Sequence, residues 1–330
     1  MNRGSSPARP GSPPPPPVIR VSGLSKAYGS LQALREVNFT VRRGEILAYL
    51  GPNGAGKTTT IRILSGLLDR DAGEVEISGR DVAVEPVTVK RLIGVVPDTS
   101  NLYPELSCRR NLEYLGELYG LSRSLRRARA AALLDLFSLG DRASAPFGAL
   151  SHGLKRRLTI AAALVHDPEV LFLDEPTTGL DVPSARALRD LIRDINRQGK
   201  TVFLTTHNLQ EAEALCQQVV ILIKGRVAAW GTPAAIRERV SRLRLLEVTF
   251  SGAVNAAQVR QACPAILSLT ASHQGWRLEF ADTHSALAQL LAFCESAGLR
   301  LEEVSASGVS LEEAFLEILQ ENLSEPGDAS

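Results

Sequence analysis

Residues 45–68 contain the stretch that decides the fold: Glu45-Ile-Leu-Ala-Tyr-Leu50, then Gly51-Pro-Asn-Gly-Ala-Gly-Lys-Thr58, then a segment of helical character that ends at Leu68. The middle part has the pattern G-x-x-x-x-G-K-[ST] between an apolar run and a helix, the context that a phosphate-binding loop requires. Its glycines let successive backbone N–H groups converge on phosphate oxygens. The alternative is an accidental glycine-rich turn. We predict a nucleotide-binding protein.

Two side chains of this loop have defined chemical roles. Lys57 places a positive charge at the β- and γ-phosphates, and Thr58 offers a hydroxyl to Mg²⁺. Lys57 is therefore a candidate catalytic residue and Thr58 a candidate metal ligand. The nucleotide-binding residues predicted from this segment are Gly51, Pro52, Asn53, Gly54, Ala55, Gly56, Lys57, Thr58 and Thr59.

Size and charge narrow the class of protein. The chain has 330 residues, which is enough for two ordered units. Its net charge of +1, from 37 basic and 36 acidic residues, is not the positive field of a nucleic-acid-binding protein, so no nucleic-acid partner is predicted. No apolar stretch approaches the roughly 20 residues that cross a bilayer. The widely spaced cysteines, without a C-x-x-C pair, indicate reduced and mostly buried thiols of a cytosolic protein.

The chain divides into three predicted parts. Residues 1–17 are rich in proline and are expected to be a disordered tail, with a peptide ligand for a proline-binding module as the alternative. Residues 18–235 alternate short β-rich runs with helical stretches, as in an α/β domain. An Arg-rich stretch from Tyr103 to Ala145 indicates a helical subdomain. The predicted strands of this domain are 18–21, 37–41, 45–50, 75–77, 93–96, 170–173, 202–205, 219–223 and 227–229.

Residues 236–330 are predicted to form a small α+β domain without chemistry of its own. Strand-like runs occur at Leu246–Phe250 and Trp276–Phe280, and a helix is expected near Leu287–Ala297. The final segment, Ser310–Leu319, has apolar residues near helical spacing. We expect this helix to pack on the small sheet.

A second group of candidate residues follows a buried strand. Val170-Leu-Phe-Leu-Asp-Glu-Pro-Thr-Thr-Gly-Leu-Asp181 places two acids where that strand ends. Asp174 is predicted to help hold Mg²⁺, and Glu175 to polarise the attacking water as a catalytic residue. The alternative is an acidic strand end that faces solvent.

A histidine ends a further strand, Val202-Phe-Leu-Thr-Thr-His207. His207 is predicted to donate to the γ-phosphate. The alternative is that Asn208 caps the following helix and that His207 is incidental. The three strand ends are expected to meet at the carboxyl edge of one sheet, where open α/β folds bind ligands.

A fourth segment, Leu150-Ser-His-Gly-Leu-Lys-Arg-Arg-Leu158, resembles the L-S-G-G-Q signature of the ATP-binding subunits of ABC transporters. Taken alone, this segment could equally be the start of an ordinary helix. Its position shortly before Asp174 and Glu175 favours the signature. The resemblance covers about Val18 to Thr232. It implies a P-loop NTPase core with antiparallel β and helical subdomains, and ATP and Mg²⁺ as cofactors. It also implies a second copy or a paralogue as partner in an ATP-sandwich dimer.

The same resemblance implies further site residues. Ser151 and Gly153 would grip a γ-phosphate held by the Lys57 of the other subunit. Tyr28 would stack on adenine, although taken alone it reads as a packed strand aromatic. Asp181 matches the loop that communicates between the two ATP sites. Asp98 stands where the family has a Gln that touches nucleotide-bound Mg²⁺ or the attacking water and contacts the membrane subunit.

Two residues depart from the family pattern. Asp98 is shorter than Gln and carries a carboxyl group in place of an amide, so the ATPase cycle is expected to be slower or more tightly gated. His152 replaces the first glycine of the signature pair and adds a side chain where a phosphate approaches. We expect function to survive both changes.

The C-terminal segment Ser310–Glu317 resembles the ATPases that pair with ABC-2-type permeases, which mostly export their cargo. The chain is thus expected to bind such a permease and to lie peripherally on the cytoplasmic face of the inner membrane. Two alternatives remain open. One is an ATP-gated regulatory or assembly module, motivated by Asp98 and His152. The other is a soluble ABC ATPase that acts on ribosomes or chromosomes.

Overall fold

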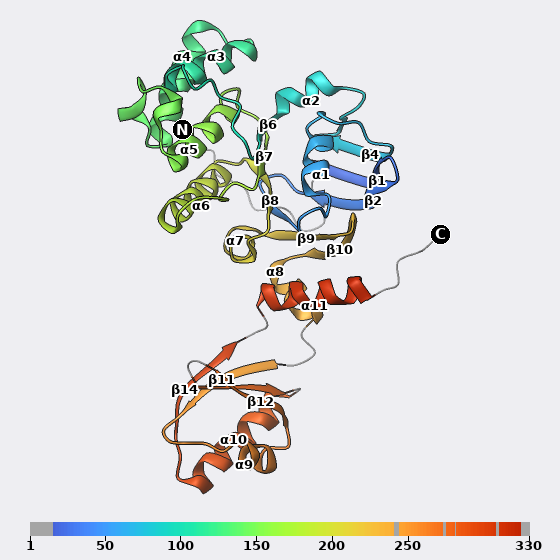
Figure 1. Ribbon diagram of the computed structural model, residues 1–330, viewed down its shortest axis with the longest axis vertical. Coiled ribbons are helices and arrows are strands. Elements are labelled where there is room, and N and C mark those ends of the chain that lie inside the picture. The colour runs from blue at the N-terminus through green and yellow to red at the C-terminus, as the bar shows by residue number, and fades with distance from the viewer. Residues whose placement is uncertain (1–15, 241–243, 273–274, 281, 308–309, 325–330) are drawn as a thin grey trace, which may run out of the picture. The chain divides into compact units, whose positions relative to one another are not determined.

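The computed structural model describes residues 16–240, 244–272, 275–280, 282–307 and 310–324 (Figure 1). Most of the proline-rich tail predicted at residues 1–17 lies outside these ranges. The chain forms two compact units. Unit 1 comprises residues up to His207 and Leu215–Val227, and unit 2 comprises Asn208–Ala214 and the residues from Ala228 onward. The domain boundary at residue 235 stays a prediction.

A mostly parallel sheet forms the centre of unit 1. The strand order is β10-β9-β3-β8-β7-β6, and the neighbouring pairs from β9 to β6 are parallel. Strands β3 and β7 are buried at every residue, as expected for a sheet covered on both faces. The strands are β3 (Ile46–Leu50), β6 (Ile93–Val96), β7 (Val170–Asp174), β8 (Thr201–Thr206), β9 (Gln218–Ile223) and β10 (Arg226–Gly231).

The register of this sheet brings the predicted site together. Leu50 pairs with Thr206, and Asp174 pairs with Thr205. Because the strands are parallel, the loops that follow β3, β7 and β8 leave from the same edge. The expectation that the three strand ends share one edge is therefore confirmed.

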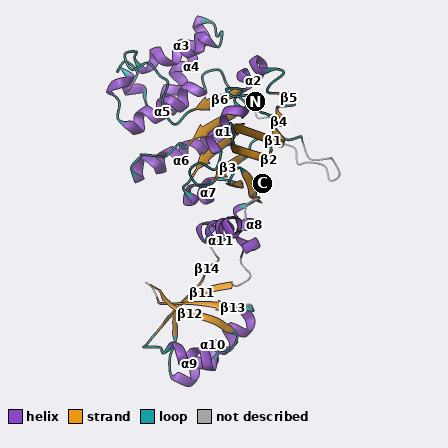
Figure 2. Cartoon of the chain, turned by 45° about the vertical axis from the view of Figure 1, so that its right-hand side comes forward, coloured by secondary structure: helices purple, strands orange, loops and turns teal. Residues whose placement is uncertain are grey.

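A second, antiparallel sheet of unit 1 has the order β2-β1-β4-β5 (Figure 2). Its strands are β1 (Ile19–Tyr28), β2 (Leu31–Val41), β4 (Ala72–Ile77) and β5 (Arg80–Asp81). The first helix, α1 (Lys57–Leu64), contributes Ile61 and Leu64 to a hydrophobic core that also contains side chains from both sheets. The phosphate-binding loop, which leads into α1, is thereby anchored in this hydrophobic core.

Helices α3 (Cys108–Leu118) and α4 (Arg123–Leu136) pack together and confirm the predicted helical segment. Each begins at a serine whose hydroxyl accepts a hydrogen bond from a backbone N–H in the first turn. Unit 1 also contains the α-helices α2 (Pro86–Leu92), α5 (His152–Ala163) and α6 (Val182–Arg197), and short 3-10 helices at Gly140–Arg142 and Phe147–Ala149.

Unit 2 contains an antiparallel sheet with the order β12-β13-β11-β14. With its two helices it has the chain order βαββαβ of ferredoxin-like folds. Its core is formed by apolar side chains and two cysteines, Cys263 and Cys294. The elements are β11 (Arg244–Phe250), α9 (Ala256–Ala262), β12 (Ile266–Ser272), β13 (Gly275–Phe280), α10 (Thr283–Ala297) and β14 (Leu301–Ser307).

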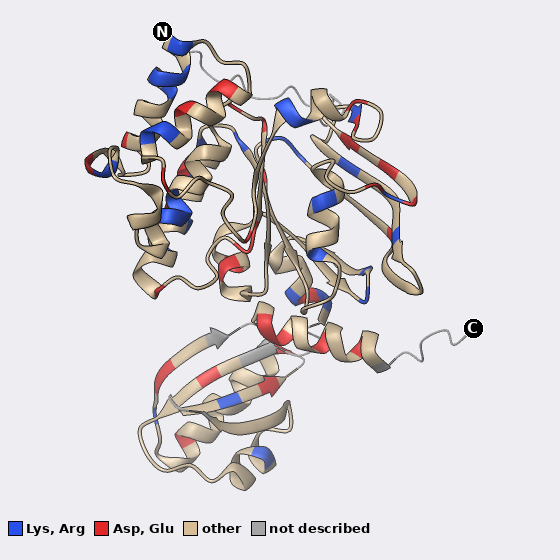
Figure 3. Ribbon diagram, turned by 45° about the horizontal axis from the view of Figure 1, so that its top comes forward, with Lys and Arg blue, Asp and Glu red and all other residues tan. Residues whose placement is uncertain are grey.

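The last helix, α11 (Leu311–Ser324), carries acidic residues along its length (Figure 3) and packs mainly against α8 (Pro233–Val240) (Figure 1). The expectation that it packs on the small sheet is therefore wrong. Its buried residues, Leu311, Ala314 and Ile318, lie outside the core of that sheet. One ion pair reaches the sheet, between Arg277 of β13 and Glu313, at 2.6 Å. Unit 2 also contains most of α7 (Leu209–Leu215).

Across the described ranges, every helix is too short or too polar to cross a lipid bilayer.

Candidate functional site

The loop between β3 and α1 contains two glycines at points where other backbone atoms come too close for a side chain. A Cβ on Gly51 would lie 2.4 Å from the carbonyl oxygen of Leu222. A Cβ on Gly56 would lie 2.7 Å from the carbonyl oxygen of Ala33, and the φ of Gly56 is +110°. Other residues would be strained at both positions. The sequence therefore needs glycine here for the backbone to wrap the loop, as the motif requires.

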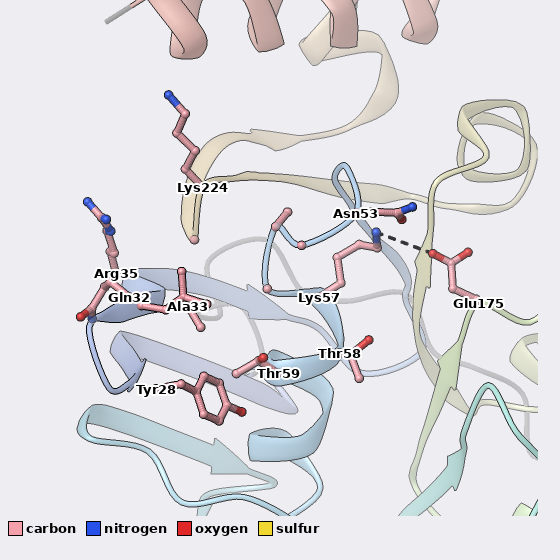
Figure 4. A pocket seen from close by; sticks show the side chains of 15 residues that line it. Tyr28, Gln32, Ala33, Arg35, Asn53, Lys57, Thr58, Thr59, Glu175 and Lys224 are labelled. Carbon is pink, nitrogen blue, oxygen red and sulfur yellow. Dashed lines mark ion pairs between the residues drawn. The ribbon is translucent and has the colours of Figure 1, made fainter. Parts of the chain in front are cut away.

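Lys57 is held inside this loop. Its ammonium donates to the carbonyl oxygens of Gly51 and Pro52, at 2.7 and 3.3 Å, and only 8% of the residue is exposed. The ammonium lies 3.7 Å from Oε1 of Glu175, and Figure 4 shows the two side chains facing each other. A bound phosphate would thus meet a preplaced cation beside a carboxylate.

The two acids at the end of β7 are held differently. Asp174 is buried, and its Oδ1 accepts a hydrogen bond from the hydroxyl of Thr205 at 2.6 Å. Glu175 has a φ of +47°, in the left-handed region that non-glycine residues rarely adopt. Its carboxylate Oε2 lies 2.9 Å from Nδ1 of His207 and accepts from the hydroxyl of Thr178 at 3.2 Å. The two oxygens of the Glu175 carboxylate thus have different neighbours, Lys57 at Oε1 and His207 at Oε2.

A cavity of about 640 Å³ opens in front of the loop. Of the predicted residues, Tyr28 and Glu175 line it together with loop residues 53–59. Tyr28 is 45% exposed as a residue, and its side chain lies at the cavity, where it is accessible for stacking on a base. The other lining residues are Leu31, Gln32, Ala33, Arg35, Lys224 and Gly225. In Figure 4 the side chains of Arg35 and Lys224 extend outward from the rim of this cavity.

Several predicted residues do not line this cavity. Asp98 is exposed just beyond β6. Ser151 is the N-cap of α5, where its hydroxyl accepts from the N–H of Leu154 at 3.5 Å, and Gly153 follows in the first turn. Within one copy, Ser151 and Gly153 are thus separate from the loop that holds Lys57. Their predicted role requires a second copy.

The described residues include no group of three or more His, Cys, Asp or Glu side chains that could hold a metal ion by themselves. Proteins usually hold Mg²⁺ beside a nucleotide through one or two side-chain oxygens that supplement phosphate and water ligands. Thr58 at the cavity and Asp174 at the end of β7 are oxygen donors of this kind. The donor set fits Mg²⁺, and Thr205 orients the Asp174 carboxylate.

The sequence interpretation missed several supporting residues. The hydroxyl of Thr205 donates a hydrogen bond to Asp174. The backbone N–H of Glu175 donates to Thr205, with 3.1 Å to the Thr205 carbonyl oxygen and 3.1 Å to the Thr205 hydroxyl. The threonine pair before His207 was visible, but its partners depend on the pairing of β7 with β8. Gln32, Arg35 and Lys224 belong to no recognisable sequence motif. They line the cavity because β2, which contains Gln32 and Arg35, and the residue after β9, Lys224, lie beside the loop in the folded chain.

The loop that contains Gly179 and Asp181 lies against the start of α5, where His152 departs from the family pattern. A Cβ on Gly179 would lie 3.2 Å from Cε1 of His152, so the imidazole covers this glycine. Asp181, two residues on, is the N-cap of α6. Its side chain accepts from the N–H of Ser184 at 2.9 Å, and hydrogen bonding by Ser184 lowers the pKa of the Asp181 carboxyl.

Fold and site together define a P-loop ATPase with an inserted helical segment and a separate signature helix. Residues 34–178 match the ABC transporter family. Relatives include a linearmycin resistance ATP-binding protein of Bacillus subtilis, 32% identical over 91% of this chain and 98% of the relative. A daunorubicin resistance ATP-binding protein of Streptomyces coeruleorubidus is 37% identical over 91% of this chain and 95% of its own length. A doxorubicin resistance ATP-binding protein of Mycobacterium tuberculosis is 45% identical over 67% of this chain and 68% of its own length.

Comparison with solved structures leads to the same family. The ATP-binding subunit of an ABC transporter superposes with a TM-score of 0.62 at 36% identity, over 67% of this chain and 92% of that one. A dimeric ATP-binding cassette in a post-hydrolysis state, bound to ADP and phosphate, superposes with a TM-score of 0.59 at 30% identity. The match covers 65% of this chain and 98% of that one. The chain belongs to the ATP-binding, ATP-hydrolysing subunits of ABC transporters, in the group whose named members serve drug resistance and Nod factor export.

Proposed function

We propose that this chain powers export through an ABC-2-type permease, on the cytoplasmic face of the membrane, as one half of an ATP-sandwich dimer. The observation that carries the proposal is the arrangement of Lys57, Glu175 and His207 at one sheet edge. The ammonium lies 3.7 Å from the Glu175 carboxylate, and the imidazole lies 2.9 Å from it. Such a set can hold a terminal phosphate and activate a water beside it.

Each residue has a proposed role. Glu175 accepts a proton from the attacking water, and His207 holds the carboxylate and donates to the γ-phosphate. Lys57 and the N–H groups of the loop bind the phosphates, and Tyr28 stacks on adenine. Mg²⁺, when bound, would neutralise phosphate charge, with Thr58, Asp174 and Asp98 as its side-chain donors. The remaining proposed nucleotide contacts are the loop residues 51–59.

The second copy completes the site in this proposal. Ser151 and Gly153 stand at the N-terminus of a 12-residue helix, α5, whose free N–H groups and positive end favour a phosphate. They lie away from the cavity of their own copy, which fits a contact made to the ATP of the partner. Closure on ATP and reopening after hydrolysis would then supply the movement that the permease uses.

Replacement of Glu175 by Gln tests this proposal. The variant keeps the shape of the side chain and loses the base, so ATP turnover should fall by about 10²–10⁴-fold while ATP binding remains. ATP should then hold the variant as a dimer, measured by light scattering during size-exclusion chromatography. Glu303→Gln, at an exposed position of β14, is the matched control and should behave as wild type. Wild-type turnover in Glu175→Gln would refute the assigned base.

The transport partner needs a separate experiment. The tagged chain should co-purify with a membrane protein of about six spans, and phosphate release should be measured in that complex. Binding of ATP to the complex without phosphate release would instead support the ATP-gated regulatory module.

A further inference from the structure

Arg156 of the signature helix α5 is buried, with 7% of the residue exposed. Its guanidinium donates to backbone carbonyl oxygens of two segments. Nε donates to Pro176 at 2.9 Å, and Nη2 donates to Asp174 and Glu175 at 2.5 and 3.1 Å. Nη1 donates to Pro97 and Asp98 at 2.6 and 3.3 Å. One side chain therefore joins α5 to the ends of both β7 and β6.

The first of these segments carries the proposed catalytic base. The backbone of Glu175 is fixed from both directions, because its N–H donates to Thr205 and its carbonyl accepts from Arg156. A left-handed φ at a non-glycine residue persists only where neighbouring groups hold it. Arg156 is thus one of the groups that keep the Glu175 carboxylate turned toward Lys57.

The second segment carries Asp98, and α5 touches it again. The hydroxyl of Thr159, one turn beyond Arg156, lies 3.0 Å from the hydroxyl of Ser100. At the start of α5, the His152 ring covers Gly179, and a Cβ on Gly153 would lie 3.2 Å from Oγ of Ser184. Helix α5 is therefore joined to the segments that follow β6 and β7 at its first turn, at Arg156 and at Thr159.

We infer that Arg156 is a positioning residue that couples the two ATP sites of the dimer. It ties the backbone of Glu175 and Asp98, which serve the ATP of its own copy, to the helix end that presents Ser151 and Gly153 to the ATP of the partner. This inference rests on the proposed sandwich dimer. Occupancy of one site then sets the position of the signature helix at the other site, and cooperativity in ATP is the expected consequence.

Arginine suits this task and lysine does not. The guanidinium is a rigid planar fork, and its three nitrogens here reach five carbonyl oxygens on two segments. A lysine ammonium keeps the charge but concentrates its donors at one point, so it cannot hold β6 and β7 at once. Arg156→Lys therefore keeps a positive charge at this position and removes the hydrogen bonds that join the two segments.

The test measures ATP turnover against ATP concentration for the full-length protein in its permease complex. The wild type should give a Hill coefficient between about 1.5 and 2, because two coupled sites allow at most 2. Arg156→Lys should give about 1. Its kcat should fall by about 10²-fold, the typical loss when a catalytic group is displaced by about 1 Å. Binding of a fluorescent ATP analogue to the isolated chain should stay within about twofold of wild type, since the cavity is unchanged.

The matched control is Arg157→Lys, the same change at the next residue of α5, where the wild-type Hill coefficient should remain. A merely structural role of Arg156 would lower the melting temperature and the active fraction and leave the Hill coefficient unchanged. That result, or wild-type kinetics in Arg156→Lys, would overturn the inference while the dimer stands. Absence of both an ATP-dependent dimer and cooperativity in the wild type would instead overturn the sandwich, and the coupling with it.

A second variant keeps the inference testable if Arg156→Lys does not fold. Thr159→Val removes the hydroxyl that meets Ser100 and keeps the β-branched shape, so the Hill coefficient should move toward 1 by a smaller amount. Thr159→Ser keeps a hydroxyl and should restore the wild-type value. An unchanged Hill coefficient in Thr159→Val would overturn the coupling through α5.

Discussion

Both units combine strands and helices, yet unit 1 gathers polar residues at one edge of its parallel sheet, whereas the described residues of the βαββαβ part of unit 2 are built around an apolar core. In unit 1 the parallel strands β3, β7 and β8 all end at the same edge, so Lys57, Asp174 and His207 leave from neighbouring points. In the antiparallel sheet of unit 2, neighbouring strands end at opposite edges, and its core is apolar apart from cysteines. Parallel topology, more than composition, is what builds a site here.

Truncation of one core aromatic in each unit should give the largest effect. Phe203 packs with Phe39, Tyr49 and Phe172 in unit 1, and Phe280 is 1% exposed in the core of unit 2. Phe203→Ala and Phe280→Ala should each cost about 3–5 kcal/mol of unfolding free energy in their own unit. Denaturant unfolding followed by hydrogen exchange would locate the loss. ATP-analogue binding should weaken only in Phe203→Ala, and equal weakening in both variants would contradict separate units.

Removal of one cation from each unit should separate chemistry from stability. Lys57→Ala should lower ATP turnover by about 10²–10³-fold, as expected for loss of a donor aimed at the charge that develops on a phosphate. Arg277→Ala removes the ion pair with Glu313 and should leave turnover unchanged, at a cost of about 0.2–1 kcal/mol. Phosphate release and thermal melting measure the two quantities. A large loss of turnover in Arg277→Ala would give unit 2 a part in the chemistry.

The helix caps of the two units offer a smaller, matched comparison. Asp181 caps α6, and Ser310 caps α11 through the N–H of Glu313, whose carboxylate accepts in return from the N–H of Ser310 at 2.8 Å. Asp181→Ala and Ser310→Ala should each cost about 0.5–2 kcal/mol. Asp181→Ala should also slow turnover, because the cap holds the loop that follows Glu175. Equal turnover in both variants would show that this loop needs no cap.

The smallest expected effect is a pH dependence in unit 1. His166 stacks on Tyr119 with 3.7 Å between ring centroids, its Nε2 lies 2.8 Å from the Ile93 carbonyl oxygen, and burial lowers its pKa. The unfolded chain therefore takes up this proton at a higher pH than the folded one. Stability should fall as the pH drops below about 6.5, the ordinary histidine value, until the folded pKa is passed.

Urea unfolding between pH 7.5 and 5 would measure this dependence. His166→Gln should remove part of it, because glutamine keeps a donor for the Ile93 carbonyl and does not titrate. His284→Gln, at an exposed position in unit 2, is the control and should keep the wild-type profile. The same profile in all three proteins would assign the dependence to other groups.

Much of unit 1 was predictable because its signals are local. Strand β6 has the predicted bounds, and β3, β7, β8 and β9 begin or end within one residue of prediction. In unit 2, β12 and β14 were missed. Glu302 and Glu303 stand side by side near the start of β14, where the pairing with β11 shifts register, so the segment lacks the clean apolar–polar alternation of a half-buried strand. Its pairing with β11 decides its structure instead.

By itself the sequence determined where the candidate site lies in the chain: the loop that ends in Lys57 and Thr58, the acids Asp174 and Glu175, and the signature segment. These are short patterns whose function depends on residue type and spacing within a few positions. Only the tertiary structure decided that Arg156 bonds to both strand ends, that Thr205 orients Asp174, and that α11 packs on α8. Those contacts join residues far apart in the chain, and their geometry is set by strand register and helix packing, which no local pattern encodes.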